Sequence, residues 1–222
     1  MTIVSKDEAP GSARASQRRP GRPKAEDVAL IEARLIDEAA QLFSEKGYGH
    51  TTMSAVAAAA RVSKTTLYSR FPAKGDLFRA MVERQMKEWG NGARNTAIAP
   101  EASLEDLLLI YGDISLRAGT SPDFIQLNRL LYSESGRFPE LGVIARDRMN
   151  VGVGYLAEEI RRRAERDGAT VQNPANMARF YLTLLAGWTS NAILSDTLPS
   201  VRDREDWLRE AVGVLMRSLD IW

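Results

Sequence analysis

The stretch that decides the fold is TTMSAVAAAARVSKTTLYSRFPAKGDL, residues 51–77. Its first half predicts a short helix, because apolar side chains recur at spacings of three and four residues: Met53, Val56, Ala57 and Ala60. Either Thr51 or Thr52 can cap the amino end of this helix. A second helix should follow after a tight turn.

The second helix has a clear start and a clear stop. Ser63 is a natural N-cap for it. Pro72 lacks an amide hydrogen and disfavours helical geometry in Phe71, so the helix should end near Arg70 after only two turns. Leu67 and Phe71 would then face inward, which leaves the other face polar.

The outer face of the second helix suits a polyanion. Its outward positions are polar or basic: Lys64, Thr65, Thr66, Ser69 and Arg70. No aspartate or glutamate occurs between Ala55 and Gly75, so nothing on this face repels a phosphate. These features indicate a helix-turn-helix that binds DNA.

The motif is more specific than a bare helix-turn-helix. The run A-x-x-A-x-V-S-x-x-T-L-Y-x-x-F-P-x-K-x-x-L, residues 57–77, resembles the DNA-binding domain of the TetR family of bacterial transcriptional regulators. Residues 35–43, 47–48 and 51–52 share this resemblance. The family has an all-helical fold, in which a three-helix DNA-binding domain precedes a helical domain for ligand binding and dimerisation.

Three positions depart from the family pattern. Arg61 stands at the usual turn glycine, Thr65 at a second common glycine and Gly75 at a common glutamate. A positive φ at Arg61 would cost roughly 1 kcal/mol or more, because a side chain crowds the backbone in that conformation.

The resemblance also implies roles for individual residues. The first turn of the second helix contacts bases in the family, which makes Lys64, Thr65 and Thr66 the candidate base readers. Neighbouring groups hold phosphates, and the candidates are Thr51, Tyr68, Arg70 and Lys74. Thr52, Ser63 and Ser69 complete the predicted DNA-binding set. The alternative for all of them is a solvated polar face.

Composition narrows the class of protein. With 222 residues, 44% of them hydrophobic and 27% charged, the chain can bury a substantial core. The absence of cysteine and the single histidine argue against disulfides, metal sites and a histidine-based triad. No apolar run approaches the roughly 18 residues that span a bilayer. We therefore expect a cytoplasmic protein that is not an enzyme and needs no metal or cofactor.

The amino-terminal segment, residues 1–24, is basic and lacks apolar periodicity. Six basic and two acidic residues give it a net charge of +4, whereas the whole chain carries only +1. We expect a disordered arm. Its sequence RRPGRPK, residues 18–24, resembles an AT-hook, which would place Arg18, Arg19 and Arg22 in the minor groove of A·T-rich DNA. The alternative is a solvated linker.

The rest of the chain predicts helices only, about nine in total. A first helix over 25–46 should end at Gly47, a left-handed cap, and complete a DNA-binding domain over 25–73. A linking helix over 74–95 should couple it to a ligand-binding and dimerisation domain over 96–222. Prolines separate the helices of that domain, which we expect at 101–118, 121–135, 139–166, 174–195 and 203–220.

Aromatic and aliphatic stripes in the second domain predict a ligand cavity. The candidate lining residues are Trp89, Tyr111, Ile114, Phe124, Leu127, Asn128, Leu131, Met149, Val153, Phe180, Leu184 and Trp188. Arg148 and Asn191 lie on or beside the same stripes. Such stripes also form ordinary cores, so the pattern leaves both interpretations open.

Two further clusters have structural interpretations. Arg161, Arg162 and Arg163, with Arg166 nearby, follow two glutamates, residues 158–159, and precede Glu165, which predicts a salt-bridged solvent face. A dimer interface is predicted on the last two helices, where the apolar faces contain Leu182, Leu185, Ala186, Thr189, Ile193, Trp207, Leu208, Ala211, Leu215 and Leu219.

The sequence thus predicts a homodimeric repressor that binds a palindromic operator and is released by a small hydrophobic or amphipathic effector. A solidly packed second domain would instead favour an effector-independent or architectural DNA-binding protein. An enzyme that merely contains a helix-turn-helix is a third hypothesis, which the lone histidine and the lack of a glycine-rich phosphate loop argue against.

Overall fold

A computed structural model describes residues 25–95, 98–195 and 198–222, with the side chains of 25–27 and 88–95 left out. The predicted basic arm, including Arg18, Arg19 and Arg22, lies outside these residues.

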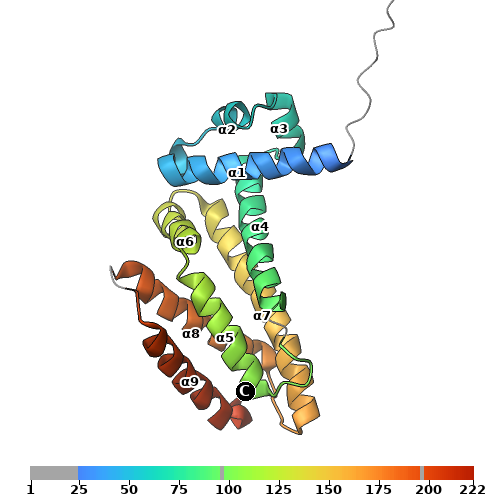
Figure 1. The fold of residues 1–222 in the computed structure, drawn as a ribbon, viewed down its shortest axis with the longest axis vertical. Coiled ribbons are helices and arrows are strands. Elements are labelled where there is room, and N and C mark those ends of the chain that lie inside the picture. Colours follow the sequence, from blue (N-terminus) through green and yellow to red (C-terminus); the bar gives the residue numbers. More distant parts are fainter. Residues whose placement is uncertain (1–24, 96–97, 196–197) are drawn as a thin grey trace, which may run out of the picture.

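The described residues form helices and no strand, which confirms the predicted all-α class (Figure 1). The α-helices are α1 Ala25–His50, α2 Met53–Ala59, α3 Lys64–Arg70, α4 Lys74–Asn95, α5 Leu104–Gly119, α6 Pro122–Glu134, α7 Pro139–Asp167, α8 Pro174–Leu194 and α9 Val201–Arg217. A short 3-10 turn, Leu219–Ile221, follows α9.

The helix starts follow from local chemistry. Proline occupies the first turn of α6, α7 and α8, where its missing amide hydrogen costs nothing. Ser103 and Ser200 begin α5 and α9 with capping boxes, each completed by the aspartate three residues later. These signals explain why the predicted helix bounds in the second half lie within three residues of the observed ones.

The first helix is interrupted at Gly47, as predicted. Gly47 has φ 78° and ψ 163°, so the helix ends where predicted, but in an extended conformation with positive φ instead of the predicted left-handed helical one. This conformation is essentially restricted to glycine. The chain turns there, and Tyr48 becomes completely buried directly after the turn. The last residues assigned to α1 therefore run in a different direction from its main body.

Two hydrophobic cores hold the molecule together. The first joins α1–α4 but also contains residues from the second half of the chain, namely Leu127 and Leu131 of α6 and Leu141 and Ile144 of α7. The second core lies among α5, α7, α8 and α9. Figure 1 shows α1 lying across one end of α4, next to α6. The helix-turn-helix is therefore packed, through α1 and α4, against the rest of the protein.

Gly47→Ala tests this turn. The backbone conformation is strained for alanine, and the added Cβ would lie 3.0 Å from Glu134 Oε1. We expect a loss of about 1–3 kcal/mol in the free energy of unfolding, measured by urea denaturation. Gly136→Ala is the control, since nothing lies within 4 Å of its added Cβ and its φ is not positive. Equal stability of the two variants would contradict the conclusion that the turn requires glycine at residue 47.

Candidate nucleic-acid interface

Side-chain caps fix both short helices of the helix-turn-helix. The Thr52 hydroxyl accepts a hydrogen bond from Ala55 N at 3.1 Å, so Thr52 rather than Thr51 caps α2. The Ser63 hydroxyl accepts one from Thr66 N at 3.0 Å and caps α3. Arg61 lies in the turn between them, at the position where the family usually has a glycine. Its φ is 54°, which is the positive φ considered for this position from the sequence.

The outer face of α3 is accessible. Lys64, Thr65, Tyr68 and Ser69 are exposed, whereas Leu67 is completely buried. Thr66 is half-buried, and its hydroxyl lies 2.8 Å from that of Ser63. The helix is anchored by its apolar side and offers a basic and hydroxyl-bearing face, as a DNA reader requires.

The predicted phosphate contact of Thr51 is wrong. Its side chain is only 2% exposed, and its hydroxyl donates to the carbonyl oxygens of Gly47 at 2.8 Å and Leu42 at 3.0 Å. Arg70 is also engaged, since its guanidinium pairs with Glu32 at 2.8 Å. Both side chains brace α1 against the helix-turn-helix.

Lys74 has partners within the protein. Its ammonium donates to the carbonyl oxygens of Tyr48 at 2.7 Å, Thr51 at 3.1 Å and Gly49 at 3.4 Å. Because an ammonium has three donors, all of them are used within the protein. Burial lowers the pKa of Lys74, while Glu140 and Glu134 act in the opposite direction. Lys74 thus holds the α1–α2 connection in place, and its predicted phosphate contact stays a prediction.

A junction that the sequence did not predict surrounds Lys74. The Tyr48 hydroxyl donates to Glu140 at 3.0 Å, and Gly49 N donates to Glu134 at 3.3 Å. The Phe138 ring packs edge-on against Tyr48 at 5.0 Å between centroids, and the Lys74 ammonium lies 4.3 Å from the centre of the Tyr48 ring. Burial and the hydrogen bond to Glu140 raise the pKa of Tyr48. The segment LYSESGRFPEL, residues 131–141, supplies the second-domain half of this junction.

The predicted cavity residues are divided between the two cores, although Phe124 and Tyr111 both lie near Arg148. Leu127 and Leu131 belong to the first core, whereas Val153 belongs to the second. Residues that pack partly buried against the second core are Tyr111, Met149 and Trp188. Helical spacing shows which face is buried but not which core receives it, and this explains the division.

The remaining cavity candidates are also dispersed. Phe180 is 42% exposed and packs against Trp222 at 4.9 Å between ring centroids. The buried Asn128 amide donates to the carbonyl of Phe124, within its own helix. Ile114 and Leu184 are half-buried, and the Trp89 side chain lies outside the described residues.

Arg148 occupies an aromatic environment inside the second half of the chain. Its guanidinium lies 4.8 Å from the centre of the Phe124 ring. Burial lowers its pKa, and the nearby Tyr132 and Tyr111 act in the opposite direction.

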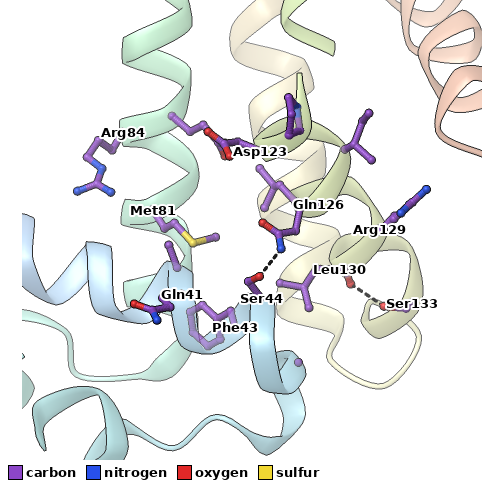
Figure 2. A pocket seen from close by; sticks show the side chains of 16 residues that line it. Gln41, Phe43, Ser44, Met81, Arg84, Asp123, Gln126, Arg129, Leu130 and Ser133 are labelled. Carbon is purple, nitrogen blue, oxygen red and sulfur yellow. Dashed lines mark hydrogen bonds between the residues drawn. The ribbon is translucent and has the colours of Figure 1, made fainter. Parts of the chain in front are cut away.

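A hollow of about 860 Å³ lies between α1, α4 and α6, and Leu127 is its one residue from the predicted cavity set. Its walls include Phe43 and Ser44 of α1, Met81 of α4 and Gln126 of α6 (Figure 2). The hollow thus lies beside the place where α6 packs against α1 and α4.

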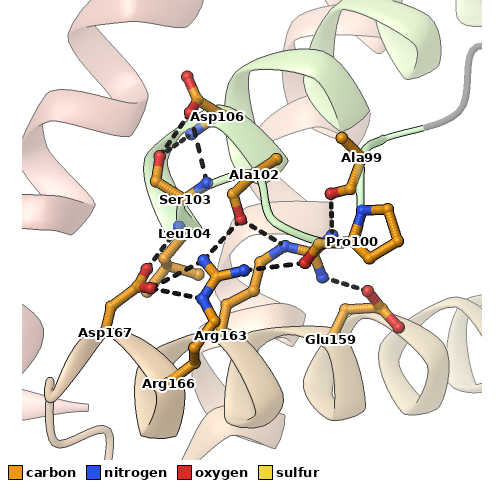
Figure 3. A network of polar contacts seen from close by, with 10 residues as sticks. All are labelled: Ala99, Pro100, Ala102, Ser103, Leu104, Asp106, Glu159, Arg163, Arg166 and Asp167. Carbon is orange, nitrogen blue, oxygen red and sulfur yellow. Dashed lines mark hydrogen bonds and ion pairs between the residues drawn. The ribbon is translucent and has the colours of Figure 1, made fainter.

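The arginine cluster of α7 divides into two parts. Arg161 and Arg162 pair with glutamates on the solvent face, as predicted. Arg163 instead is 2% exposed, pairs with Glu159 and donates to Ala102 O at 3.1 Å. Arg166 donates to the carbonyls of Pro100 and Ala102, both at 2.8 Å (Figure 3). The predicted solvent face was wrong for Arg163, which anchors the segment before α5.

Comparison with known families identifies the family to which the fold belongs. Residues 35–81 match the family described as bacterial regulatory proteins, tetR family. Residues 106–218 match the C-terminal domain of AefR-like transcriptional repressors. The chain belongs to the TetR family. It is a DNA-binding transcriptional regulator, and its α2–turn–α3 unit is the helix-turn-helix of that family.

Relatives and solved structures agree with membership of the TetR family. An HTH-type transcriptional regulator of Mycobacterium tuberculosis is 30% identical over 149 residues, which cover 64% of this chain and 68% of the relative. The structure of a TetR-family regulator from Mesorhizobium loti has a TM-score of 0.69 at 21% identity, over 86% of this chain and 96% of that chain. FadR of Bacillus halodurans, a fatty acid degradation regulator, has a TM-score of 0.64 at 19% identity, over 85% and 96%.

The described helices of this TetR-family chain include none that is both long and apolar enough to cross a membrane.

Lys64→Ala tests the interface. Each phosphate neutralised by a basic residue contributes roughly −0.9 to the slope of log affinity against log salt, so a dimer that loses Lys64 contacts to phosphate should show a slope flatter by about two. If Lys64 instead reads base edges, the slope should hold while sequence preference at one position relaxes. Lys87→Ala, an exposed lysine of α4, is the matched control. An unchanged slope and an unchanged sequence profile would exclude Lys64 from the interface.

Proposed function

We propose that the protein is a homodimeric repressor that binds a palindromic operator and leaves it when a small hydrophobic or amphipathic effector binds. The observation that carries the proposal is the capped helix α3, whose accessible face bears Lys64, Thr65 and Tyr68 and no carboxylate. The match to AefR-like repressors supports repression rather than activation of transcription. A cytoplasmic location and the absence of enzymatic activity belong to the same proposal.

The experiment is to sequence the genomic DNA that the purified protein retains, with and without a panel of hydrophobic compounds. A repressor of this kind should retain a small set of palindromic sites upstream of genes and release them with some of the compounds. Release follows from linkage: an effector that favours the form with lower DNA affinity weakens operator binding by the same free energy. Specific retention that no compound reverses would favour the effector-independent alternative.

A dimer interface is proposed on α8, but on a different face from the one that the sequence predicts. Leu185, Thr189 and Ile193 are buried within the monomer. The exposed stripe of α8 contains small and apolar residues at helical spacing: Phe180, Thr183, Gly187, Asn191 and Leu194. Leu194 is 79% exposed. Small residues in such a stripe allow a second copy of the helix to approach closely.

Gly187→Arg should therefore produce a monomer. Gly187 is exposed and nothing lies within 4 Å of an added Cβ, so the fold of one subunit should tolerate the arginine, while close pairing of two α8 helices should not. Light scattering at micromolar concentration gives the mass, and circular dichroism checks the fold. Gly136→Arg, in an equally open position between α6 and α7, should remain dimeric. A dimeric Gly187→Arg protein would place the interface elsewhere.

The basic arm, residues 1–24, is proposed to add minor-groove contacts on either side of the operator core. An arm that uses two to four basic residues per subunit contributes about four to seven units to the salt slope of a dimer. Its RRPGRPK sequence carries this part of the proposal.

Deleting residues 1–24 should flatten the salt slope by about four to seven units and remove the preference for A·T-rich flanking sequence. The preference for the core half-sites should survive, because α3 remains. Affinities for one operator, measured from low to moderate salt with full-length and truncated protein, decide the matter. If the plots of log affinity against log salt for the two proteins coincide, the arm is only a linker.

A further inference from the structure

We propose that the effector of this regulator is an amphipathic carboxylate and that Arg148 of α7 holds its acidic group. The inference rests on the proposed release by an effector and names the chemical class of that effector. It also gives a role to Arg148, which the sequence places beside the aromatic stripes of the second half.

Arg148 lies among aromatic side chains that come from three helices. Its guanidinium lies over the Phe124 ring of α6, 4.8 Å from the ring centre. Tyr111 of α5 and Tyr132 of α6 are close enough to act on its pKa. Because α5, α6 and α7 pack against one another, residues far apart in the sequence form one cluster: Tyr111, Phe124, Tyr132 and Arg148, called here the Arg148 cluster.

The chemistry of the Arg148 cluster favours an acidic ligand. A ring face attracts the positive charge of a guanidinium but supplies no lone pairs to its five N–H donors. A carboxylate supplies lone pairs in the matching bidentate geometry. Burial lowers the pKa of Arg148 on balance, so the charged form is disfavoured at this place. A bound carboxylate would offset that effect, because a nearby opposite charge favours the charged form.

The Arg148 cluster reaches the protein surface and is largely apolar. Arg148 is half-buried, and Tyr132 is 57% exposed, with its hydroxyl 2.9 Å from the Ser190 hydroxyl of α8. A ligand can therefore enter beside Tyr132 and reach the guanidinium with its acidic group. The rings of Tyr111 and Phe124, both half-buried, would cover its apolar body.

The carboxylates nearest in sequence to Arg148 and Tyr111 are ion-paired. Asp147 pairs with Arg79 of α4 at 2.8 Å, and Asp113 pairs with Arg204 of α9 at 3.3 Å. Their charges are thus balanced by arginines, which reduces repulsion of an incoming anion.

The position of Arg148 connects it to the DNA-binding half. Ile144, one turn earlier on α7, belongs to the first core, which contains α1–α4. The adjacent Asp147 holds Arg79 of α4, and Figure 1 shows α4 and α7 running side by side below α1. A ligand that draws the Arg148 side chain toward its carboxylate thus acts on the part of α7 that supports α4.

Matched acids and amides test the charge class on the wild-type protein. The probes are 2-naphthoate against 2-naphthamide and decanoate against decanamide, which compare an aromatic with an aliphatic body. We expect at least one acid to bind at least tenfold more tightly than its amide, measured by isothermal titration calorimetry. Equal binding within both pairs, or no binding of any of the four compounds at millimolar concentration, would overturn the proposal.

Two substitutions test Arg148 itself. Arg148→Gln removes the charge, and Arg148→Met also keeps an apolar stem for packing. Either variant that keeps the wild-type circular dichroism spectrum should bind acid and amide within twofold of each other. Arg146→Gln, at an exposed arginine two residues earlier on α7, is the control and should keep the tenfold preference. A preference for the acid that survives at residue 148 would exclude Arg148 as its anchor.

The effector role is tested with acidic compounds that release the wild-type protein from its retained DNA. Arg148→Gln should raise the concentration needed for release at least tenfold, while Arg146→Gln should respond like the wild type. If Arg148→Gln also responds like the wild type, or if only uncharged compounds release the wild type, this inference fails while the proposed function stands. If no compound releases the wild type, effector release itself fails, and the effector role of Arg148 with it.

Discussion

The ammonium of Lys74 is the point on which the arrangement of the two halves depends. Three carbonyl oxygens from the connection between α1 and α2 converge on it, at 2.7–3.4 Å. Hydrogen bonds to a charged donor are worth roughly 1.5–3 kcal/mol each, so this cluster is strong for a surface connection. Tyr48 and Phe138 cover it, and Glu140 and Glu134 tie the same connection to the second half. The orientation of α2 and α3 is thereby fixed relative to α7.

Local signals explain how much of the fold the sequence could predict. Ser63, Pro72, Gly47 and the prolines that begin α6, α7 and α8 each act on their own backbone, and the structure confirms every one of them. The positive φ of Arg61 is another local effect, because the turn demands it whatever residue stands there.

The errors concern partners that neither helical spacing nor residue type reveals. Thr51 looks like a free polar group in the sequence, yet its hydroxyl donates to the carbonyls of Gly47 and Leu42. Lys74 meets the carbonyl of Tyr48, which only the folded chain brings near. Arg163 likewise appears to be one of four surface arginines, but the segment before α5 folds over it and buries it. The cavity residues divide between the two cores for a related reason, since helical spacing carries no information about which of two cores a face will join.

The shared first core has a consequence for the order in which the protein becomes functional during synthesis. The helix-turn-helix is complete in the nascent chain long before Leu127, Leu131, Leu141 and Ile144 are made, yet these side chains belong to its core. Burial of a leucine or isoleucine side chain contributes about 1.5–3 kcal/mol, so the head lacks a large part of its stability until α7 has begun to emerge from the ribosome. We expect a fragment that ends before α6 to be less stable than the same helices in the whole chain. Competence for DNA is gained only when the half that regulates it is already present.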